Sequence, residues 1–487
     1  MNIGLLPVRF VVRHFSIVIV SCFFMCLTGC PSVGPDYVRP ETRTPDGWQA
    51  RMENGIDAQP VDADLLARWW TTLDDAVLSD LIDRVLAGNL DYQTAQARVW
   101  EARARRGVSK SAYFPTLDVA GTYTKSRGSQ NAGADFETDL YTAGLDAGWE
   151  LDFFGGTRRA VEAAGADLAA SQEALNAALV SLLAETAISY IDLRTLQTRI
   201  QVAEAFLDIQ QETYQFTRSR FEAGLSNELA FQSARYLLAE TQANIPTLKT
   251  ALAGALNRLA VLVGQPPGAL NQTLTTQLPV PVPPKSIAVG LPADTLRNRP
   301  DVRQAERLVA AQTARIGVAK SDLFPKIRLT GFIGYSAPET DDLIDSANEY
   351  WHLGPGIQWR IFSGGAIVRN IEVQTARQSQ TITQFKSTVL KALEEVENAL
   401  TAYANEQVRR EALITAKEAA GKAYELALDQ YQAGLVDFDN VLIAQRYLLS
   451  YQDQLAVSEG TVTMNLVRLY KALGGGWDFQ KMVETGK

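Results

Sequence analysis

Apolar residues recur at every seventh position over two long stretches of the chain. The first stripe consists of Leu179, Leu193, Ile200 and Leu207, with Thr186 at the one remaining position, and a later stripe consists of Val441, Leu448, Leu455, Val462 and Leu469. A seven-residue repeat predicts helices that pack as a left-handed coiled coil. Residues 157–222 contain no proline, so this helix would cover about 65 residues, or about 100 Å at 1.5 Å per residue.

The sequence Ala-Gly-Leu marks the predicted end of each long helix. It occurs around Gly224 and again around Gly434, and glycine commonly follows a helix C-terminus. A return helix is predicted after each glycine, which places both glycines at the tips of helical hairpins. The long helices are expected at about 157–263 and about 365–473.

Other stretches alternate between apolar and polar positions. Within 140–151, Leu145 and Trp149 share one face, whereas Asp146 and Glu150 share the other. Segments of about ten alternating residues with aromatics near their ends are typical of membrane β-strands, with lipid on one side and water on the other. A half-buried hairpin of a soluble protein would give the same pattern.

The alternation predicts strands within about 116–152 and about 326–362. Their connecting loops, Lys125–Asp139 and Ser336–Tyr350, are rich in small and polar residues. Membrane barrels place their longer loops outside the cell, so we expect both loops there. Four strands cannot close a barrel, because about eight are needed to fit side chains inside. Oligomerisation is therefore expected, and three chains would supply twelve strands.

The chain repeats itself at a fixed offset. "ARRGVSKSAYFP" begins at Ala104 and "ARIGVAKSDLFP" begins at Ala314, with eight of twelve letters identical; we call the offset from Ala104 to Ala314 the repeat interval. In each copy a helix, 91–112 or 301–322, should end before a Phe-Pro pair, because proline disfavours helix in the preceding residue. These helix-to-strand junctions are Phe114-Pro115 and Phe324-Pro325. We therefore predict one body built from two tandem units.

The first part of the chain resembles a bacterial lipoprotein signal. Arg9 and Arg13 precede an apolar run, Phe15–Thr28, which is too short to span a bilayer. The run ends in Leu27-Thr28-Gly29-Cys30, which predicts lipidation of Cys30; an ordinary signal peptide is the alternative. The domains expected are a signal peptide (1–29), an extended segment (30–60), a first repeat (61–285) and a second repeat (286–487).

Charge and cysteine content exclude several classes of protein. The net charge of −9 becomes −11 when cleavage removes Arg9 and Arg13, and an acidic chain without basic clusters argues against nucleic-acid binding. Cleavage before Cys30 would leave a single cysteine, so no disulfide is possible. No apolar run after Cys30 approaches the length of about 18 residues that a membrane-spanning helix needs, and we expect no transmembrane helix.

The residues do not favour an enzyme. The two histidines, His14 and His352, form no cluster with cysteines that could hold zinc, and no phosphate-binding loop ends in Gly-Lys-Ser/Thr. Neither a metal nor a cofactor is expected. Asp437 and Asp439 could be read as a carboxylate pair for acid–base work, but without a pocket they fit a hairpin tip better.

Taken together, these motifs resemble the TolC-type outer-membrane factor family. The Phe-Pro junctions, the Ala-Gly-Leu tips, "NRPDVRQAE" at 298–306 and the lipoprotein signal occur in the order of its NodT-type lipoproteins, which serve resistance-nodulation-division (RND) efflux pumps. The resemblance covers nearly the whole mature chain. It implies a mostly α-helical homotrimer with a twelve-stranded outer-membrane β-barrel, a periplasmic tunnel of long helices, an adaptor protein and an inner-membrane pump.

The resemblance implies a passive outer-membrane channel that exports small toxic compounds. Alternatives are a type I protein-secretion channel and a lipid-anchored periplasmic coiled-coil scaffold without a pore. In this family the second hairpin closes the tunnel, so Asp437, Asp439 and Ile443 are candidate gate residues. The two aspartates could instead only cap the return helix, where a carboxylate satisfies free N–H groups.

Overall fold

The computed structural model describes residues 32–42, 44–53, 55–60, 62–129, 131, 136–284 and 286–477. Cys30 and the predicted signal peptide lie outside these residues. The chain divides into two compact units. The sheet unit contains the described residues up to Pro40 together with Trp100–Ser171 and Ala305–Phe385, and the helical unit contains Glu41–Val99, Gln172–Gln304 and the described residues from Lys386.

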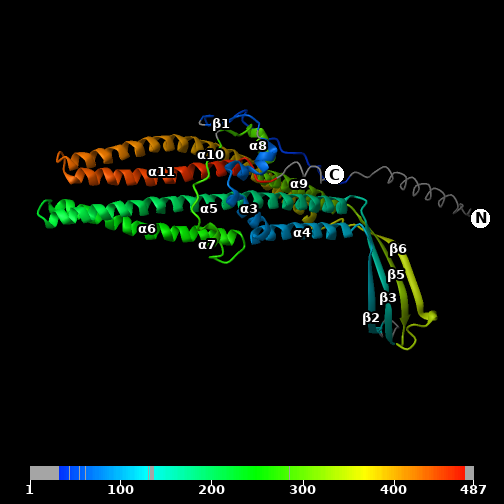
Figure 1. Ribbon diagram of the computed structural model, residues 1–487. Helices are drawn as coiled ribbons and strands as arrows, with labels where there is room; N and C mark the ends of the chain where they lie inside the picture. Colours follow the sequence, from blue (N-terminus) through cyan, green and yellow to red (C-terminus); the bar gives the residue numbers. More distant parts are fainter. Residues whose placement is uncertain are drawn as a thin grey trace, which may run out of the picture. The chain divides into compact units, whose positions relative to one another are not determined.

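The main elements occur in pairs whose first residues are separated by the repeat interval (Figure 1). The pairs are α4 (Leu90–Ser111) and α9 (Pro300–Ser321), β2 (Thr116–Arg127) and β5 (Lys326–Ala337), α5 (Gly156–Glu222) and α10 (Ala366–Gln432), and α6 (Glu228–Leu262) and α11 (Phe438–Ala472). The partners of a pair are equally long, with 67 residues in α5 and α10 and 35 residues in α6 and α11. The predicted tandem duplication is confirmed.

The strands β3 (Glu137–Leu151) and β6 (Glu349–Gln358) complete the sheet, and β6 is the shorter of the two. The remaining elements are short, apart from α3: β1 (Ile56–Asp57), α2 (Ala63–Ala67), η1 (Trp69–Leu73), α3 (Ala76–Gly88), α7 (Asn271–Leu274), β4 (Ile287–Ala288), α8 (Pro292–Asn298) and η3 (Ser346–Asn348). Of these, β1 and β4 pair in parallel and bring a segment near the N-terminus beside the segment between the repeats.

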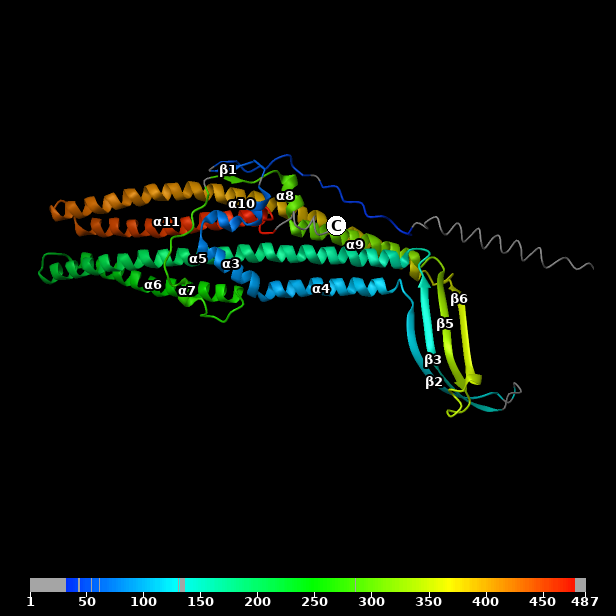
Figure 2. The ribbon, with the colours of Figure 1, turned by 45° about the vertical axis from the view of Figure 1, so that its right-hand side comes forward.

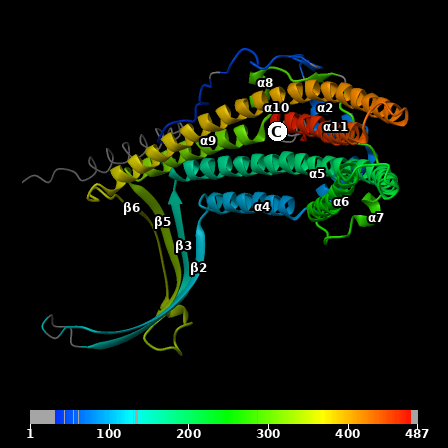
Figure 3. The ribbon, with the colours of Figure 1, turned by 90° about the vertical axis from the view of Figure 1, so that its left-hand side faces the viewer.

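In the sheet unit the four strands form one antiparallel sheet in the order β2-β3-β5-β6 (Figures 2 and 3). Each repeat contributes a hairpin, and β3 pairs with β5 to join the two hairpins. The strands β2 and β6 are the sheet edges, and neither edge has a partner strand among the described residues.

The Phe-Pro pairs lie in the turns between helix and strand. The helix α4 ends at Ser111, Phe114 N–H donates to the carbonyl of Ser111, and β2 begins at Thr116. The Trp149 indole donates to the Tyr113 carbonyl at 3.0 Å, and Trp359 donates to Leu323 at the same distance in the second repeat. The repeated motif therefore builds one tryptophan-braced corner in each copy.

The main core lies in the helical unit. It gathers buried side chains from η1, α3, α5, α6, α10 and α11, including the fully buried Trp69 of η1, which stacks on Tyr470 at 5.6 Å. The buried Arg194 of α5 donates to the carbonyl of Thr276, and Thr463 of α11 donates to Pro281. These bonds fasten the proline-rich segment between the repeats to the long helices, and its Leu270 is fully buried.

The helix α5 contains an apolar window that is long enough to cross a membrane, with a mean hydropathy of 1.5. Core helices of folded proteins reach the same level, so this window does not contradict the expectation that the chain has no transmembrane helix. Half of the window is buried inside the chain, and α5 contributes core residues such as Leu193. The alanine-rich surface needed for close helix packing raises the hydropathy, so we interpret α5 as a core helix.

Candidate functional site

The two faces of the sheet differ in polarity. Residues directly opposite each other on neighbouring strands share a face. The register therefore assigns each side chain of the strands to one of the two faces of the sheet. One face carries exposed apolar side chains: Leu117, Val119, Leu145, Ile333, Trp351, Leu353 and Ile357. The other face carries mostly polar ones: Asp118, Thr122, Thr142, Asp146, Glu150, Arg328, Thr330, Ser336 and Gln358.

Aromatic side chains lie toward both ends of the apolar face. Near the loops, Tyr123 stacks on Tyr141 with ring centroids 4.7 Å apart and donates a hydrogen bond to Asp139 at 2.7 Å. Near the helices, Trp149 and Trp359 brace the corners described above. Aromatic girdles of this kind flank the lipid-facing band of membrane β-barrels.

The strands extend further into the predicted loops than the sequence suggested. The strand β2 continues to Arg127 and β3 begins at Glu137, and Lys125 forms a 3.5 Å ion pair with Glu137 across the hairpin. The irregular parts of the two loops are therefore shorter than Lys125–Asp139 and Ser336–Tyr350. The alternation of apolar and polar residues does not extend to these strand ends, because both faces of the strands are polar beyond the apolar band.

The glycines Gly224 and Gly434 end the long helices in the same conformation. Both have φ of 72°, in the left-handed region that glycine adopts without strain. The N–H of Leu225 donates to Arg220 O, and the N–H of Leu435 donates to Gln430 O. These bonds close a Schellman motif at each tip, so the two hairpins turn in the same way.

The three gate candidates lie on the first two turns of α11. Asp437 occupies the N-cap position, is exposed and makes no side-chain cap bond. One carboxylate oxygen of Asp439 is buried and has no hydrogen-bond partner in the described structure. Ile443 is 48% exposed. The structure therefore brings the three residues onto one short segment, with one aspartate and the isoleucine facing outward from this chain.

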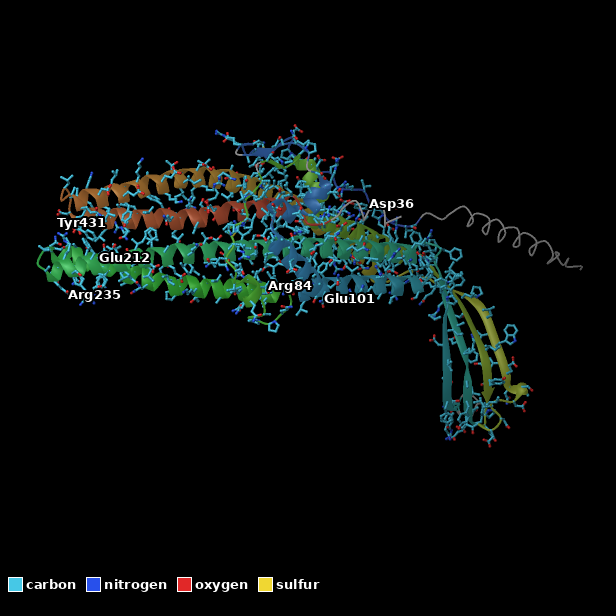
Figure 4. The ribbon with its side chains drawn as sticks, viewed as in Figure 1. Asp36, Arg84, Glu101, Glu212, Arg235 and Tyr431 are labelled. Carbon is cyan, nitrogen blue, oxygen red and sulfur yellow. The ribbon has the colours of Figure 1, made fainter. Side chains whose placement is uncertain are left out.

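A cluster in which three helices meet near the second tip was not predicted. The Phe216 ring of α5 lies 6.2 Å from Tyr431 of α10 and 5.9 Å from Phe438 of α11. The Arg220 guanidinium lies 5.5 Å from the Tyr431 ring, and Figure 4 shows Tyr431 at this end of its helix. The contacts tie the second hairpin to the first; heptad patterns identify packing faces but not which helices become neighbours.

Burial changes the titration of one tyrosine near the tips. Burial, and then the nearby Glu212 carboxylate, raise the pKa of Tyr424 on α10, so this phenol is neutral at physiological pH. No group of three metal-binding side chains occurs among the described residues.

The family model described as "Outer membrane efflux protein" matches residues 81–265 and 291–475. The chain belongs to this family. The starts of the two matched segments are separated by the repeat interval, as are the paired elements of the fold. The resemblance to TolC-type outer-membrane factors is thereby confirmed, and this outer membrane efflux protein is located in the outer membrane with its helical part in the periplasm.

Similar proteins cover almost the whole chain. Nodulation protein T of Rhizobium leguminosarum bv. trifolii is 31% identical over 457 residues, which are 94% of this chain and 96% of that protein. The cation efflux system protein CusC of Escherichia coli K12 is 30% identical over 461 residues, 93% of this chain and 98% of that protein.

Solved structures of channels share the fold. The outer-membrane channel OprN is 35% identical with a TM-score of 0.86, and the match covers 92% of this chain and 99% of OprN. The open state of the MtrE outer-membrane channel of Neisseria gonorrhoeae is 28% identical with a TM-score of 0.80, over 92% and 99% of the two chains. These similar proteins are channels and efflux proteins rather than enzymes.

Proposed function

We propose that three copies of this outer membrane efflux protein form one export channel. The observation that carries the proposal is a sheet with an apolar face and two edges, β2 and β6, that are unpaired in the described structure. Unpaired backbone groups cost several kcal/mol each in lipid, so a membrane-embedded sheet must close on itself. Pairing β6 of one copy with β2 of the next closes twelve strands, with the apolar face toward lipid and the polar face toward water.

The channel would act with a periplasmic adaptor and an inner-membrane pump of the RND class. CusC is named a cation efflux protein, and TtgF of Pseudomonas putida is named a toluene efflux pump outer membrane protein. Small toxic compounds are therefore the proposed cargo. Lipidation of Cys30 would add a membrane anchor, and Asp437, Asp439 and Ile443 would line the periplasmic gate.

Reconstitution in planar lipid bilayers tests the channel. The purified protein should insert as discrete conductance steps and should migrate as a heat-sensitive trimer in detergent. A protein that forms neither steps nor a trimer would contradict the proposal. A protein-secretion channel would also conduct; the two export functions are separated by whether deletion of the chain sensitises cells to small toxic compounds or abolishes secretion of a protein.

Membrane retention distinguishes the channel from a lipid-anchored scaffold. The test variant carries Cys30→Ser behind an ordinary cleavable signal peptide, so that it is exported without acyl chains. A barrel should keep this variant in the outer membrane after a carbonate wash, because the apolar face alone holds it there. A scaffold without a barrel would appear in the soluble periplasmic fraction.

A further inference from the structure

One cluster of rings interrupts the polar face of the sheet. Phe332 of β5 lies on this face, opposite His352 of β6 in the register. Its ring stacks on Tyr350 with centroids 4.9 Å apart and planes at 22°, and on His352 at 6.0 Å and 10°. Three nearly parallel rings are therefore stacked on one another in a compact aromatic cluster, which we call the aromatic platform (Phe332, Tyr350 and His352), on a face otherwise suited to water.

Two glycines make room for the platform. A Cβ on Gly144 would lie 2.5 Å from the Phe332 ring, and a Cβ on Gly334 would lie 2.9 Å from it. These glycines are opposite each other on β3 and β5. Because these glycines have no side chains, the Phe332 ring packs directly over the backbone of β3 and β5. The ring is half-buried, whereas His352 stays exposed.

The platform has no counterpart in the first repeat. The residues one repeat interval earlier are Thr122, Leu140 and Thr142, and β2 and β3 pair there without a ring cluster on that face of the described strands. The corner tryptophans and the hairpin glycines, by contrast, occur in both repeats. The platform is thus a property of the second repeat only, as expected for a functional addition rather than a structural requirement.

Two carboxylates lie in the same row as the platform, and the Arg328 guanidinium lies over Gly148, the next residue of β3 on this face. Asp146 of β3 lies directly opposite Phe332 on the same face, and Asp118 of β2 lies directly opposite Asp146. Residues opposite each other in an antiparallel pair have Cβ atoms about 5 Å apart. Both carboxylates are exposed, and neither forms an ion pair or a hydrogen bond with a side chain in the described structure. One row across the sheet therefore reads Asp, Asp, Phe, His.

We propose that the aromatic platform is a binding site for planar aromatic cations on their way out through the barrel. The inference rests on the proposed channel, in which the polar face lines the water-filled interior. A flat ring would stack on the exposed His352 at the outside of this stack, and its positive charge would lie on the side of Asp146. Stacking and charge complementarity then act on the same solute.

The same geometry fits other solutes less well. A hydrated metal ion finds no group of three metal-binding side chains in the described part of the chain. A neutral arene gains the stacking but not the attraction of Asp146, and an aliphatic ammonium ion gains the attraction but not the stacking. The proposal therefore predicts an order of affinity in which the aromatic cation ranks first.

Block of single-channel current by ethidium tests the platform. Tetrabutylammonium serves as an aliphatic cation and benzyl alcohol as a neutral arene. Ethidium should block at the lowest concentration, and Phe332→Ala should weaken its block about fivefold to tenfold while leaving block by tetrabutylammonium within about twofold. Asp146→Asn should weaken block by both cations, and added salt should do the same.

Two further variants complete the test. Phe332→Leu keeps the apolar volume without a ring, so it should fold and still weaken ethidium block about fivefold. Thr122→Ala changes the matching position of the first repeat and should leave block at the wild-type level. Equal ethidium block in the wild type and both Phe332 variants, or tighter block by tetrabutylammonium than by ethidium, would overturn the proposal.

A second measurement keeps this inference separate from the channel itself. Ethidium fluorescence is titrated with each detergent-solubilised protein, which requires no conducting pore. Absence of conductance would refute the proposed channel. If the protein conducts but binds ethidium equally well with and without Phe332, only the proposed binding site on the platform is refuted. Loss of ethidium affinity in Phe332→Leu but not in Thr122→Ala supports it.

Discussion

Individual residues at the start of α11 differ from their counterparts in the first repeat. Asn227 caps α6, because its side chain accepts a hydrogen bond from Ala230 N–H at 2.8 Å. Asp437 is in the corresponding N-cap position but leaves its carboxylate unbonded and exposed. Asp437 therefore does not cap α11 through its side chain in the way that Asn227 caps α6.

The gate proposal makes a prediction for three residues of α11. Replacing Asp437 and Asp439 together by alanine should lower the cation-to-anion permeability ratio about twofold or more, because threefold symmetry would bring six carboxylates together. Ile443→Ala should raise the single-channel conductance by removing part of an apolar constriction. Both are measured in planar bilayers.

The first hairpin supplies a control for this prediction. Glu228 begins α6 at the position that Phe438 holds in α11, and Glu228→Ala removes a carboxylate from a hairpin tip without touching the second hairpin. This variant should conduct like the wild type. If it changes selectivity as much as the aspartate variant does, the gate lies elsewhere.

Single residues with strong local preferences were predictable, and those defined by contacts were not. The Ala-Gly-Leu sequence identified Gly224 and Gly434 because a left-handed turn has a local chemical signature. The contact between Phe216 and Tyr431 joins α5 of the first repeat to α10 of the second. Nothing local marks it, since any aromatic on a heptad stripe looks like core.

At the scale of elements, the long helices followed closely from the sequence. The predicted first long helix is the 67-residue α5, because the heptad stripe and the glycine fix its face and its end. The 13-residue α3 was not predicted, although its apolar residues Leu78, Leu81, Ile82 and Val85 have helical spacing and are fully buried.

The extended segment after Cys30 is held on the sheet unit by a small set of specific contacts. We call Ser32–Arg39 the anchor segment. Arg159 of α5 is almost fully buried and bonds Asp36 at 2.6 Å and the Val33 carbonyl at 3.2 Å. Burial lowers the pKa of Arg159, but its bonds to Asp36 and Glu162 outweigh this effect and raise it, so the guanidinium stays charged.

Two contacts with α9 also hold the anchor segment in place. Tyr37 donates to Glu306 at 3.2 Å, and Arg39 forms a 3.0 Å ion pair with the same carboxylate. Burial, and next the Glu306 carboxylate, raise the pKa of Tyr37 to about 12. The stabilisation from this raised pKa is therefore complete below about pH 10 and is lost only as the pH rises toward about 12.

Arg159→Met should release the anchor segment from α5. The variant keeps the aliphatic stem but loses the bonds to Asp36 and the Val33 carbonyl, and hydrogen bonds to charged groups contribute about 1.5–3 kcal/mol each. Hydrogen exchange of the peptide spanning 33–39, followed by mass spectrometry, should be accelerated about tenfold or more.

The second repeat again provides the control. Arg369 stands one repeat interval after Arg159 and pairs with Glu372, as Arg159 pairs with Glu162, but its side chain is 78% exposed. Arg369→Met should leave exchange of the anchor segment unchanged. Equal protection of residues 33–39 in the wild type and in Arg159→Met would show that the other contacts suffice.

At the scale of the whole molecule, repetition and asymmetry have different functions. The elements that build the sheet and the hairpins recur at the repeat interval. The features that distinguish the copies are the unbonded Asp437, the aromatic platform and the anchor segment, which lies on Arg159 and not on Arg369. In a chain built from two repeats, positions related by the repeat interval can therefore have different functions.

The orientation of the sheet yields the last prediction. The helical part is periplasmic, so the hairpin loops between β2 and β3 and between β5 and β6 should face the cell exterior. Cysteine introduced at Ser129 or at Ser346, both exposed, should react with a membrane-impermeant maleimide on intact cells. Background is low because proposed signal cleavage and lipidation leave no other free thiol in the mature chain.

Ala433→Cys serves as the matched control, since this exposed residue precedes Gly434 at a hairpin tip. It should react only after the outer membrane is disrupted, because the reagent cannot reach the periplasm otherwise. Labelling of Ser129→Cys and Ser346→Cys only in disrupted cells would reverse the orientation of the sheet. Equal labelling of all three variants in intact cells would mean that the reagent had crossed the outer membrane. A periplasmic protein in the same cells would then be labelled as well, and this serves as the check.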